Sequence, residues 1–144
     1  MTGSTSKASI VVLTTSYPTA TSLGGIFVHS LTKRLLENYK PVVLAPLVPD
    51  SSPVEVRDGI VIYRHPVSPW GNLGLCQGSG IFSNLQRRPW LIILVPFLVY
   101  NQIKALKSVV SSTNAKVIHA HWVLVSGMSA VLYKTLFNRR VSIL

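Results

Sequence analysis

The sequence predicts an α/β fold in which a parallel β-sheet carries helices on both faces. Short apolar runs rich in β-branched residues alternate with stretches whose apolar residues recur at helical spacing. Hydrophobic residues make up 48% of the 144 residues and charged residues only 12%, which favours strands buried on both faces. The runs follow the order β-α-β-β-β-α-β-α-β, which is typical of a wound parallel sheet with one inserted hairpin.

In the first half of the chain, apolar runs bounded by Ser, Pro and Gly predict strands, and one amphipathic stretch predicts a helix. Val28, Leu31 and Leu35 form the expected buried stripe of that helix. Asp58-Gly59 lies between two alternating runs and predicts a hairpin turn. The expected elements are strand 9–15, helix 26–38, strand 41–49 and hairpin 54–66.

The second half of the chain predicts a loop, a long helix, and a second helix between two strands. Pro89 suits the first turn of the long helix, and Pro96 is expected to kink it. We expect the strand order 3-2-1-4-5, with a hairpin strand beside it and the last strand at an open edge. The expected elements are loop 66–80, helix 89–110, strand 116–122, helix 125–137 and strand 140–144.

The charge balance favours anionic partners. The net charge is +10, which suits a phosphate-bearing substrate, an acidic membrane surface or nucleic acid. No zinc spacing, aromatic RNA-binding motif or recognition helix is present, so we do not expect nucleic acid as a partner. Cys76 is the single cysteine, which excludes an intrachain disulfide. Residues 1–8 are polar and are expected to be disordered, and the absence of a signal sequence predicts a cytoplasmic protein.

Two pairs of residues fall where parallel strands end, which is where open α/β sheets bind ligands. Gly24 and Gly25 follow the first strand; they either let the backbone approach a phosphate or serve a tight turn with positive φ. His119 and His121 share one face of a strand, opposite Trp122. They are either hydrogen-bonded structural histidines or ligand-facing ones, and in the second case His121 is the main candidate.

A metal site would need a third ligand beside these two histidines. The candidates are His29, His65 and Cys76, and none has the spacing of a metal motif. We therefore predict no metal and no other cofactor.

Residues 90–99 carry no polar side chain, and cations flank them on both sides. As a helix of about 15 Å the run is too short to cross a hydrocarbon core of about 30 Å. It either lies on an acidic lipid surface or packs under the sheet as a core helix. The expected membrane-surface residues are Arg87, Arg88, Trp90, Lys104 and Lys107.

Three segments occur along the chain in the order "LTTSYPTATSLGGIFVHSLTKRLL", "DGIVIYRHP" and "KVIHAHWVLVSGMSAVL". Together they resemble the N-terminal, acceptor-side domain of family 4 glycosyltransferases of the GT-B fold. The resemblance implies a Rossmann-like domain over residues 9–144 that faces a second, donor-binding domain across a cleft. It implies retaining transfer from a nucleotide-sugar to an acceptor, including lipid-linked acceptors of cell-envelope or polysaccharide biosynthesis, without a metal. Gly24 and Gly25 would lie near the donor phosphates, and His119 and His121 on the acceptor side.

The sequence departs from the family in two places. Tyr39-Lys40 stands where the family usually carries Gly-His, and the chain ends at "VSIL", before the family's His-Gly motif. We therefore expect an incomplete N-domain without the donor domain, inactive alone and peripheral on the inner membrane face. It is either a truncated reading frame, one half of a split gene whose C-terminal half is encoded separately, or a decayed copy.

Acidic residues are rare in this chain, and none is assigned a catalytic role. They are Glu37, Asp50, Glu55 and Asp58, and none is expected to face the cleft. Two other interpretations stay open: a non-catalytic half-domain that binds a membrane surface or a partner, and an unrelated Rossmann-like enzyme.

Overall fold

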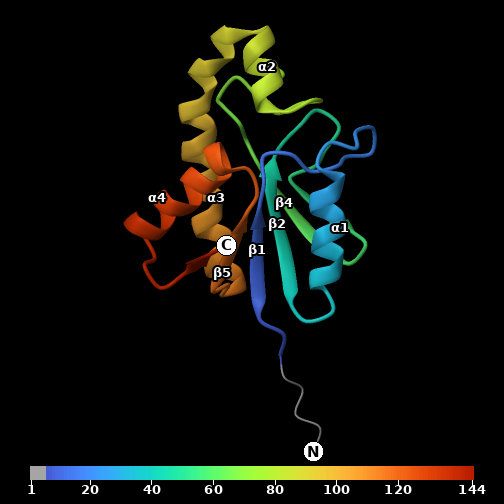
Figure 1. The fold of residues 1–144 in the computed structure, drawn as a ribbon, viewed down its shortest axis with the longest axis vertical. Helices are drawn as coiled ribbons and strands as arrows, with labels where there is room; N and C mark the ends of the chain where they lie inside the picture. Colours follow the sequence, from blue (N-terminus) through green and yellow to red (C-terminus); the bar gives the residue numbers. More distant parts are fainter. Residues whose placement is uncertain (1–5) are drawn as a thin grey trace, which may run out of the picture.

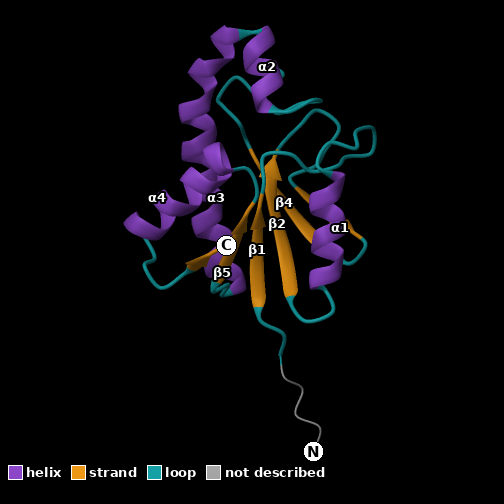
Figure 2. Ribbon diagram, viewed as in Figure 1, coloured by secondary structure: helices purple, strands orange, loops and turns teal. Residues whose placement is uncertain are grey.

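The computed structural model describes residues 6–144, and its centre is a six-stranded sheet (Figures 1 and 2). The strands are β1 (Ser9–Leu13), β2 (Lys40–Pro46), β3 (Val54–Arg57), β4 (Ile60–His65), β5 (Val117–Ala120) and β6 (Ser142–Ile143). Their order is β3-β4-β2-β1-β5-β6, and only β3 runs antiparallel to its neighbour. The expected order, the hairpin strand and the edge position of the last strand are confirmed. The disorder predicted for residues 1–8 falls mainly on residues 1–5, which lie outside the described residues.

Helices cover both faces of the sheet, as predicted (Figure 2). They are α1 (Ile26–Leu35), α2 (Ile81–Arg87), the 3₁₀ helix η1 (Pro89–Leu94), α3 (Val95–Thr113), the π-helical turn η2 (Val123–Gly127) and α4 (Met128–Leu136). Alternate residues of β1 divide between the two faces: Ile10 and Val12 pack on the α1 side, and Val11 and Leu13 on the side of α3 and α4. A strand buried on both faces therefore reads as a continuous apolar run.

Helix α1 buries a different stripe from the one predicted. Val28 is fully buried as expected, but Leu31 is exposed, and His29 and Thr32 are buried instead. Both polar side chains are hydrogen-bonded: Thr32 donates to the carbonyl of Val28, and His29 lies between Tyr17 and Asp58. Hydrogen bonding makes their burial tolerable, and hydropathy alone does not predict it.

The long helix differs from prediction at its two prolines. Pro89 begins η1, as expected, but Pro96 lies in the first turn of α3 and begins the α-helix rather than kinking it. A proline is tolerated there because first-turn amides have no partner within the helix. Helix α2 is not predicted by the sequence. It has seven residues, and only Ile81 and Leu85 pack against the core, half-buried, which is too short an apolar stripe to be recognised.

The stretch Pro89–Thr113 has one face in the core and one outside. Leu91, Leu94 and Leu98 are fully buried, and α3 contacts β1, β2, β4 and α4. Trp90, Ile92, Ile93 and Tyr100 are more than half exposed. In the described part of the chain this is the one helical stretch that is long and apolar enough to cross a membrane, by length and composition alone. Residues 91, 94 and 98 pack against Val67, Leu75 and Val125 beyond the sheet, and only the later part of α3, from about Ile103, packs on the sheet itself. Binding of the apolar run to a lipid surface stays a prediction.

His65, at the end of β4, predicts a dependence of stability on pH. The imidazole is 2% exposed, its Nδ1 donates to the carbonyl of Pro66 at 3.0 Å, and burial lowers its pKa to about 4. An unfolded chain binds the proton at about pH 6.5, so stability falls as pH decreases from 6.5 to 4. We expect His65 to contribute about 3 kcal/mol to this loss.

The measurement is urea unfolding at pH 7 and pH 4 for the native chain and His65→Asn, whose amide preserves a donor toward Pro66. The free energy of unfolding of the variant should change with pH by about 3 kcal/mol less than that of the native chain. An equal pH dependence in both proteins would contradict the prediction.

Candidate functional site

The parallel strands end at one edge of the sheet, and the loops that follow them enclose two adjoining cavities. One, called the polar cavity below, has a volume of about 350 Å³ and is lined mostly by residues with polar side chains. The other, the apolar cavity, has a volume of about 640 Å³ and a mainly apolar wall. Thr15, Ser16, Gly24 and Gly78 line both cavities, so the two form one continuous cleft. The carboxyl edge of a parallel sheet is the usual ligand site of this architecture.

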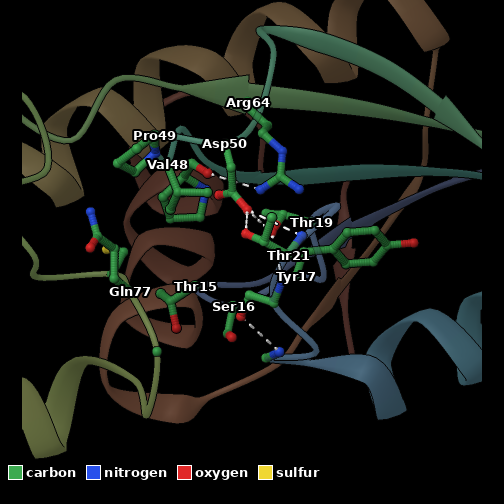
Figure 3. A pocket seen from close by; sticks show the side chains of 15 residues that line it. Thr15, Ser16, Tyr17, Thr19, Thr21, Val48, Pro49, Asp50, Arg64 and Gln77 are labelled. Carbon is green, nitrogen blue, oxygen red and sulfur yellow. Dashed lines mark hydrogen bonds between the residues drawn. The ribbon is translucent and has the colours of Figure 1, made fainter.

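Asp50 carries the negative charge of the polar cavity (Figure 3). Its Oδ2 accepts hydrogen bonds from the hydroxyls of Thr19 and Thr21 and, at 3.3 Å, from the backbone amide of Thr21. These hydrogen bonds, that of Thr19 first, lower the pKa of Asp50 to about 2. The carboxylate is therefore ionised at neutral pH and is too weak a base to remove a proton from a substrate.

This position of Asp50 corrects a sequence-based expectation. The sequence predicts a proline-bounded loop that holds Asp50 away from the cleft, but the loop after β2 folds against the loop after β1. The cause is the set of hydrogen bonds to Thr19 and Thr21, which lie about 30 residues away in the sequence.

Arg64 braces the polar cavity from β4. It is 6% exposed, and its guanidinium donates to the carbonyls of Pro46 and Pro18, both at 3.1 Å. Its Nη2 lies 3.5 Å from the carboxylate of Glu55. Burial lowers the pKa of Arg64, but the guanidinium stays charged in that ion pair. Arg64 thus ties the ends of β2 and β1 together and adds a positive charge to the wall.

A chain of hydrogen bonds fixes the outer wall of the cavity. Burial raises the pKa of Tyr17 to about 12, so its hydroxyl stays protonated and donates to Nδ1 of His29 at 2.6 Å. Nε2 of His29 then donates to Asp58 at 2.8 Å, and Lys33 lies 3.5 Å from the same carboxylate oxygen. The loop after β1 is thereby held to α1 and to the hairpin turn. Both nitrogens of His29 are engaged in these bonds.

The two glycines before α1 differ in role. Gly25 is the N-cap residue with φ of 76°, and a Cβ there would clash with the carbonyl of Ser16, 2.7 Å from its carbon. The tight-turn interpretation therefore holds for Gly25. Gly24 lines both cavities, and a Cβ would meet the Ser16 hydroxyl at 3.1 Å. Proximity of this pair to donor phosphates stays a prediction.

His119 and His121 share a face, as predicted, with ring centroids 4.5 Å apart. Neither lines the two cavities; His121 reaches the cleft only through Phe27, whose ring packs edge-on against it at 6.1 Å. Burial lowers the pKa of both imidazoles, so both are neutral at pH 7. The Nε2 atom of His121 is buried and has no protein partner. Their acceptor-side role stays a prediction.

Trp122 is not part of the strand, although the sequence predicted that it would be the last residue of that strand. β5 ends at Ala120, and Trp122 has φ of 71°, so its ring turns toward Phe27, 5.8 Å away, and lines the apolar cavity. A bulky residue with positive φ is strained, and the π-helical turn that follows is a rare conformation; both features occur often at functional sites.

The five predicted membrane-surface residues do not gather at one place. Arg87 and Arg88 line a third hollow of about 300 Å³ with Asn84 and Gly78, and Trp90 is exposed beside them. Lys104 borders a separate cavity on α3, and Lys107 lies over the ring of Phe137 at 4.8 Å.

Metal-binding side chains do not cluster in residues 6–144: no group of three or more His, Cys, Asp or Glu could hold an ion there. Two of the three third-ligand candidates, His29 and Cys76, are not free to bind an ion. His29 is hydrogen-bonded at both nitrogens, and burial raises the pKa of the Cys76 thiol to about 12.

Comparison with known proteins identifies the fold rather than the family. No family model matches the sequence, and no curated protein matches it. A solved structure of sucrose-phosphate synthase from Thermosynechococcus elongatus matches with a TM-score of 0.59 at 15% identity, over 92% of this chain and 31% of that one. A second structure of the same protein, marked as twinned, matches with a TM-score of 0.55 at 15% identity, over 90% of this chain and 59% of that one.

The chain has the Rossmann-like fold of part of a GT-B glycosyltransferase. It spans about a third of the length of the first of these structures and less than two thirds of the second. The predicted fold class, an α/β Rossmann-like sheet with helices on both faces, is confirmed.

The sequence missed the polar cleft residues, including Thr15, Ser16, Asp50, Arg64 and Gln77. Arg64 had a signal, because it lies at the carboxyl end of an alternating strand. Asp50 and Gln77 had none, because both lie in loops whose path depends on distant contacts.

Proposed function

We propose that this chain is the acceptor-side domain of a GT-B glycosyltransferase that transfers a sugar from a nucleotide-sugar to an acceptor. The observation that carries the proposal is the polar cavity at the carboxyl edge of a GT-B-type sheet. A carboxylate, hydroxyls and an amide are groups that hydrogen-bond the hydroxyls of a sugar or polyol. Asp50, Thr15, Ser16 and Gln77 supply them.

In this proposal the chain binds and orients the acceptor, and the donor is bound by a second domain. The ionised Asp50 accepts a hydrogen bond from an acceptor hydroxyl. With a pKa of about 2 the carboxylate can accept this hydrogen bond, but it is too weak a base to remove the proton. Transfer requires both substrates to be held together, so the chain alone is expected to be inactive. Gly24 and Gly25 would face the donor phosphates, and His119 and His121 would support the acceptor side through Phe27.

The finer assignments belong to the same proposal and rest on the motif resemblance. They are membership of family 4, a role in cell-envelope or polysaccharide biosynthesis, a location at the inner face of the membrane, and a donor-binding domain as partner.

One observation favours a second candidate, a half-domain that binds a membrane surface. Trp90, Ile92, Ile93 and Tyr100 expose an apolar surface on η1 and α3, near cations on the same stretch. Exposed aromatic and aliphatic side chains beside Lys and Arg are typical of segments that lie in a lipid interface.

The test of sugar transfer is a radiolabelled nucleotide-sugar assay with membrane extract, run with and without a supplied donor-side half. We expect transfer only with the donor half. Asp50→Asn, which still accepts hydrogen bonds from Thr19 and Thr21, should lower kcat/KM for the acceptor about 10- to 100-fold, as expected for loss of a hydrogen bond to a charged group.

The matched control is Glu37→Gln, which removes the same charge from an exposed position outside the cavities. Its kcat/KM should stay unchanged. Turnover by the chain alone would refute the proposal, and so would an Asp50→Asn variant as active as the control.

A further inference from the structure

We propose that the cleft binds a single-chain lipid phosphate, with its hydrocarbon in the apolar cavity and its phosphate on Arg87 and Arg88. The inference rests on the proposed function, because it names the chemical class of the acceptor. Three features carry it: an exposed apolar groove, a strained aromatic residue at its wall, and an arginine pair at its end.

The apolar cavity is an open groove lined by large side chains. Phe82, Ile92 and Leu124 line it and are each more than 60% exposed, and Trp122 is 53% exposed. Contiguous exposed apolar surface on a protein marks a place where an apolar partner binds. The volume of about 640 Å³ is in the range of a cavity that encloses one small-molecule-sized ligand, so it suits part of one hydrocarbon chain rather than a protein segment.

Trp122 supports the groove as a binding wall. Its φ of 71° is costly for a bulky residue, and that conformation turns the indole toward Phe27 and the groove. A strained residue persists where the surrounding structure enforces it, and such residues concentrate at ligand sites.

Arg87 and Arg88 supply the charge at the end of the groove. Their hollow shares Gly78 and Ser79 with the groove, so a molecule can extend from one into the other. No carboxylate within residues 6–144 lies within 4.0 Å of either guanidinium, which leaves their donors for an anion. Guanidinium groups bind phosphate through paired hydrogen bonds.

The polar cavity determines where the phosphate lies. Arg64 also lines this cavity, but its guanidinium is engaged by Glu55 and the carbonyls of Pro18 and Pro46. The ionised Asp50 therefore disfavours an anion there, so the phosphate belongs at the arginine pair and uncharged hydroxyls belong at Asp50. Gly78 lines all three hollows. An amphipathic acceptor can therefore place its hydrocarbon, its phosphate and its hydroxyls in adjoining parts of one cleft.

The test is a titration of the 144-residue chain with geranylgeranyl phosphate below its micelle concentration, followed by tryptophan fluorescence and calorimetry. Geranylgeraniol, dodecyl phosphate and inorganic phosphate are the comparison ligands. We expect Arg87→Gln/Arg88→Gln to lower the affinity for geranylgeranyl phosphate about 100-fold, the loss expected for two charge-assisted hydrogen bonds. The affinity for geranylgeraniol should not change. Phe82→Asp should lower the affinity for both ligands.

The matched control is Arg139→Gln/Arg140→Gln, which removes the same two charges from positions outside all the cavities described. Its affinity for geranylgeranyl phosphate should equal that of the native chain. If dodecyl phosphate binds as tightly as geranylgeranyl phosphate, the groove accepts any single hydrocarbon chain. If dodecyl phosphate binds more weakly, the groove prefers a prenyl chain. Both results support the proposal.

Three results would overturn it. Inorganic phosphate could bind as tightly as the lipid phosphate, the arginine variant could bind like its control, or sedimentation could show a dimer that Phe82→Asp dissociates, which would assign the groove to a second copy. Absence of lipid binding together with transfer to a water-soluble acceptor would refute this inference alone. Lipid phosphate binding without transfer in the presence of a donor half would refute only the proposed function.

Discussion

Replacing Gly25 with alanine is expected to destabilise the chain by about 4 kcal/mol, at the upper end of single-residue effects. The left-handed conformation costs an L-residue about 1–2 kcal/mol, and the new methyl group would also meet the carbonyl of Ser16. That carbonyl belongs to backbone in the floor of the cleft and cannot move aside as a flexible side chain would. Domains of this kind are stable by about 5–15 kcal/mol, so much of the margin would be lost.

Gly59→Ala is the matched control for this prediction. Gly59 has φ of 77°, nearly the same as Gly25, but no atom lies within 4 Å of the position that the alanine methyl group would occupy. The free energy of unfolding of the Gly59→Ala variant should therefore fall only by the conformational cost of about 1–2 kcal/mol. Urea unfolding of the two variants measures the difference, and equal losses would show that the contact with Ser16 carries no energy.

Anionic vesicles are expected to bind the chain about 1000-fold more tightly than they bind a variant with Arg87, Arg88, Lys104 and Lys107 replaced by Gln. Each cation near an acidic surface contributes about 1 kcal/mol, so four contribute about 4 kcal/mol. Tyr100, Lys104 and Lys107 recur at helical spacing on α3 and are exposed, which places one aromatic and two cationic side chains on one face of that helix, whereas Arg87 and Arg88 lie before η1. Vesicle sedimentation measures the binding, and added salt should weaken it.

The control for vesicle binding removes two arginines and two lysines from the other end of the sheet. Lys40, Lys116, Arg139 and Arg140 lie near the amino ends of β2, β5 and β6. Their replacement by Gln should lower binding much less, because none of the four lies on η1 or α3, where the proposed lipid-facing side chains are exposed. Equal losses in the two variants would mean that net charge rather than this surface attracts the vesicle. Binding of neutral vesicles as tight as that of anionic ones would exclude a role for charge.

The vesicle and lipid-phosphate experiments share Arg87 and Arg88, and the lysines separate them. Lys104 and Lys107 lie outside the groove and the arginine hollow. The pair Lys104→Gln/Lys107→Gln should therefore weaken vesicle binding and leave the binding of soluble lipid phosphate unchanged.

The strand order followed from local patterns because buried parallel strands are continuous apolar runs. Residues 10–13 and 41–45 each read as a strand without reference to any other part of the chain, and Asp58-Gly59 predicted its own hairpin. Helix α2 did not follow in this way, since two half-buried residues, Ile81 and Leu85, are too few to establish a period in the sequence.

The polar cleft residues could not be predicted, because contacts between distant segments position them. Asp50 reaches the cleft through bonds to Thr19 and Thr21, and Arg64 enters it by bridging the carbonyls of Pro18 and Pro46. A hydrogen bond is directional, and its partner depends on where two loops meet. Hydrophobic periodicity does not predict which two loops come into contact.

The sequence by itself determined the α/β class, the order of the strands, the excess of positive charge and the cleft edge on which Gly24, Gly25, His119 and His121 fall. Only the tertiary structure decided that Gly25 serves a tight turn, that Trp122 turns into the groove, and that Asp50 faces the cleft while the histidines stand behind Phe27. Burial of apolar surface is non-directional and depends on composition and period, so a sequence can specify it locally. The placement of a charge or a strained backbone is settled by the packing of the whole chain, because only that packing offsets its cost.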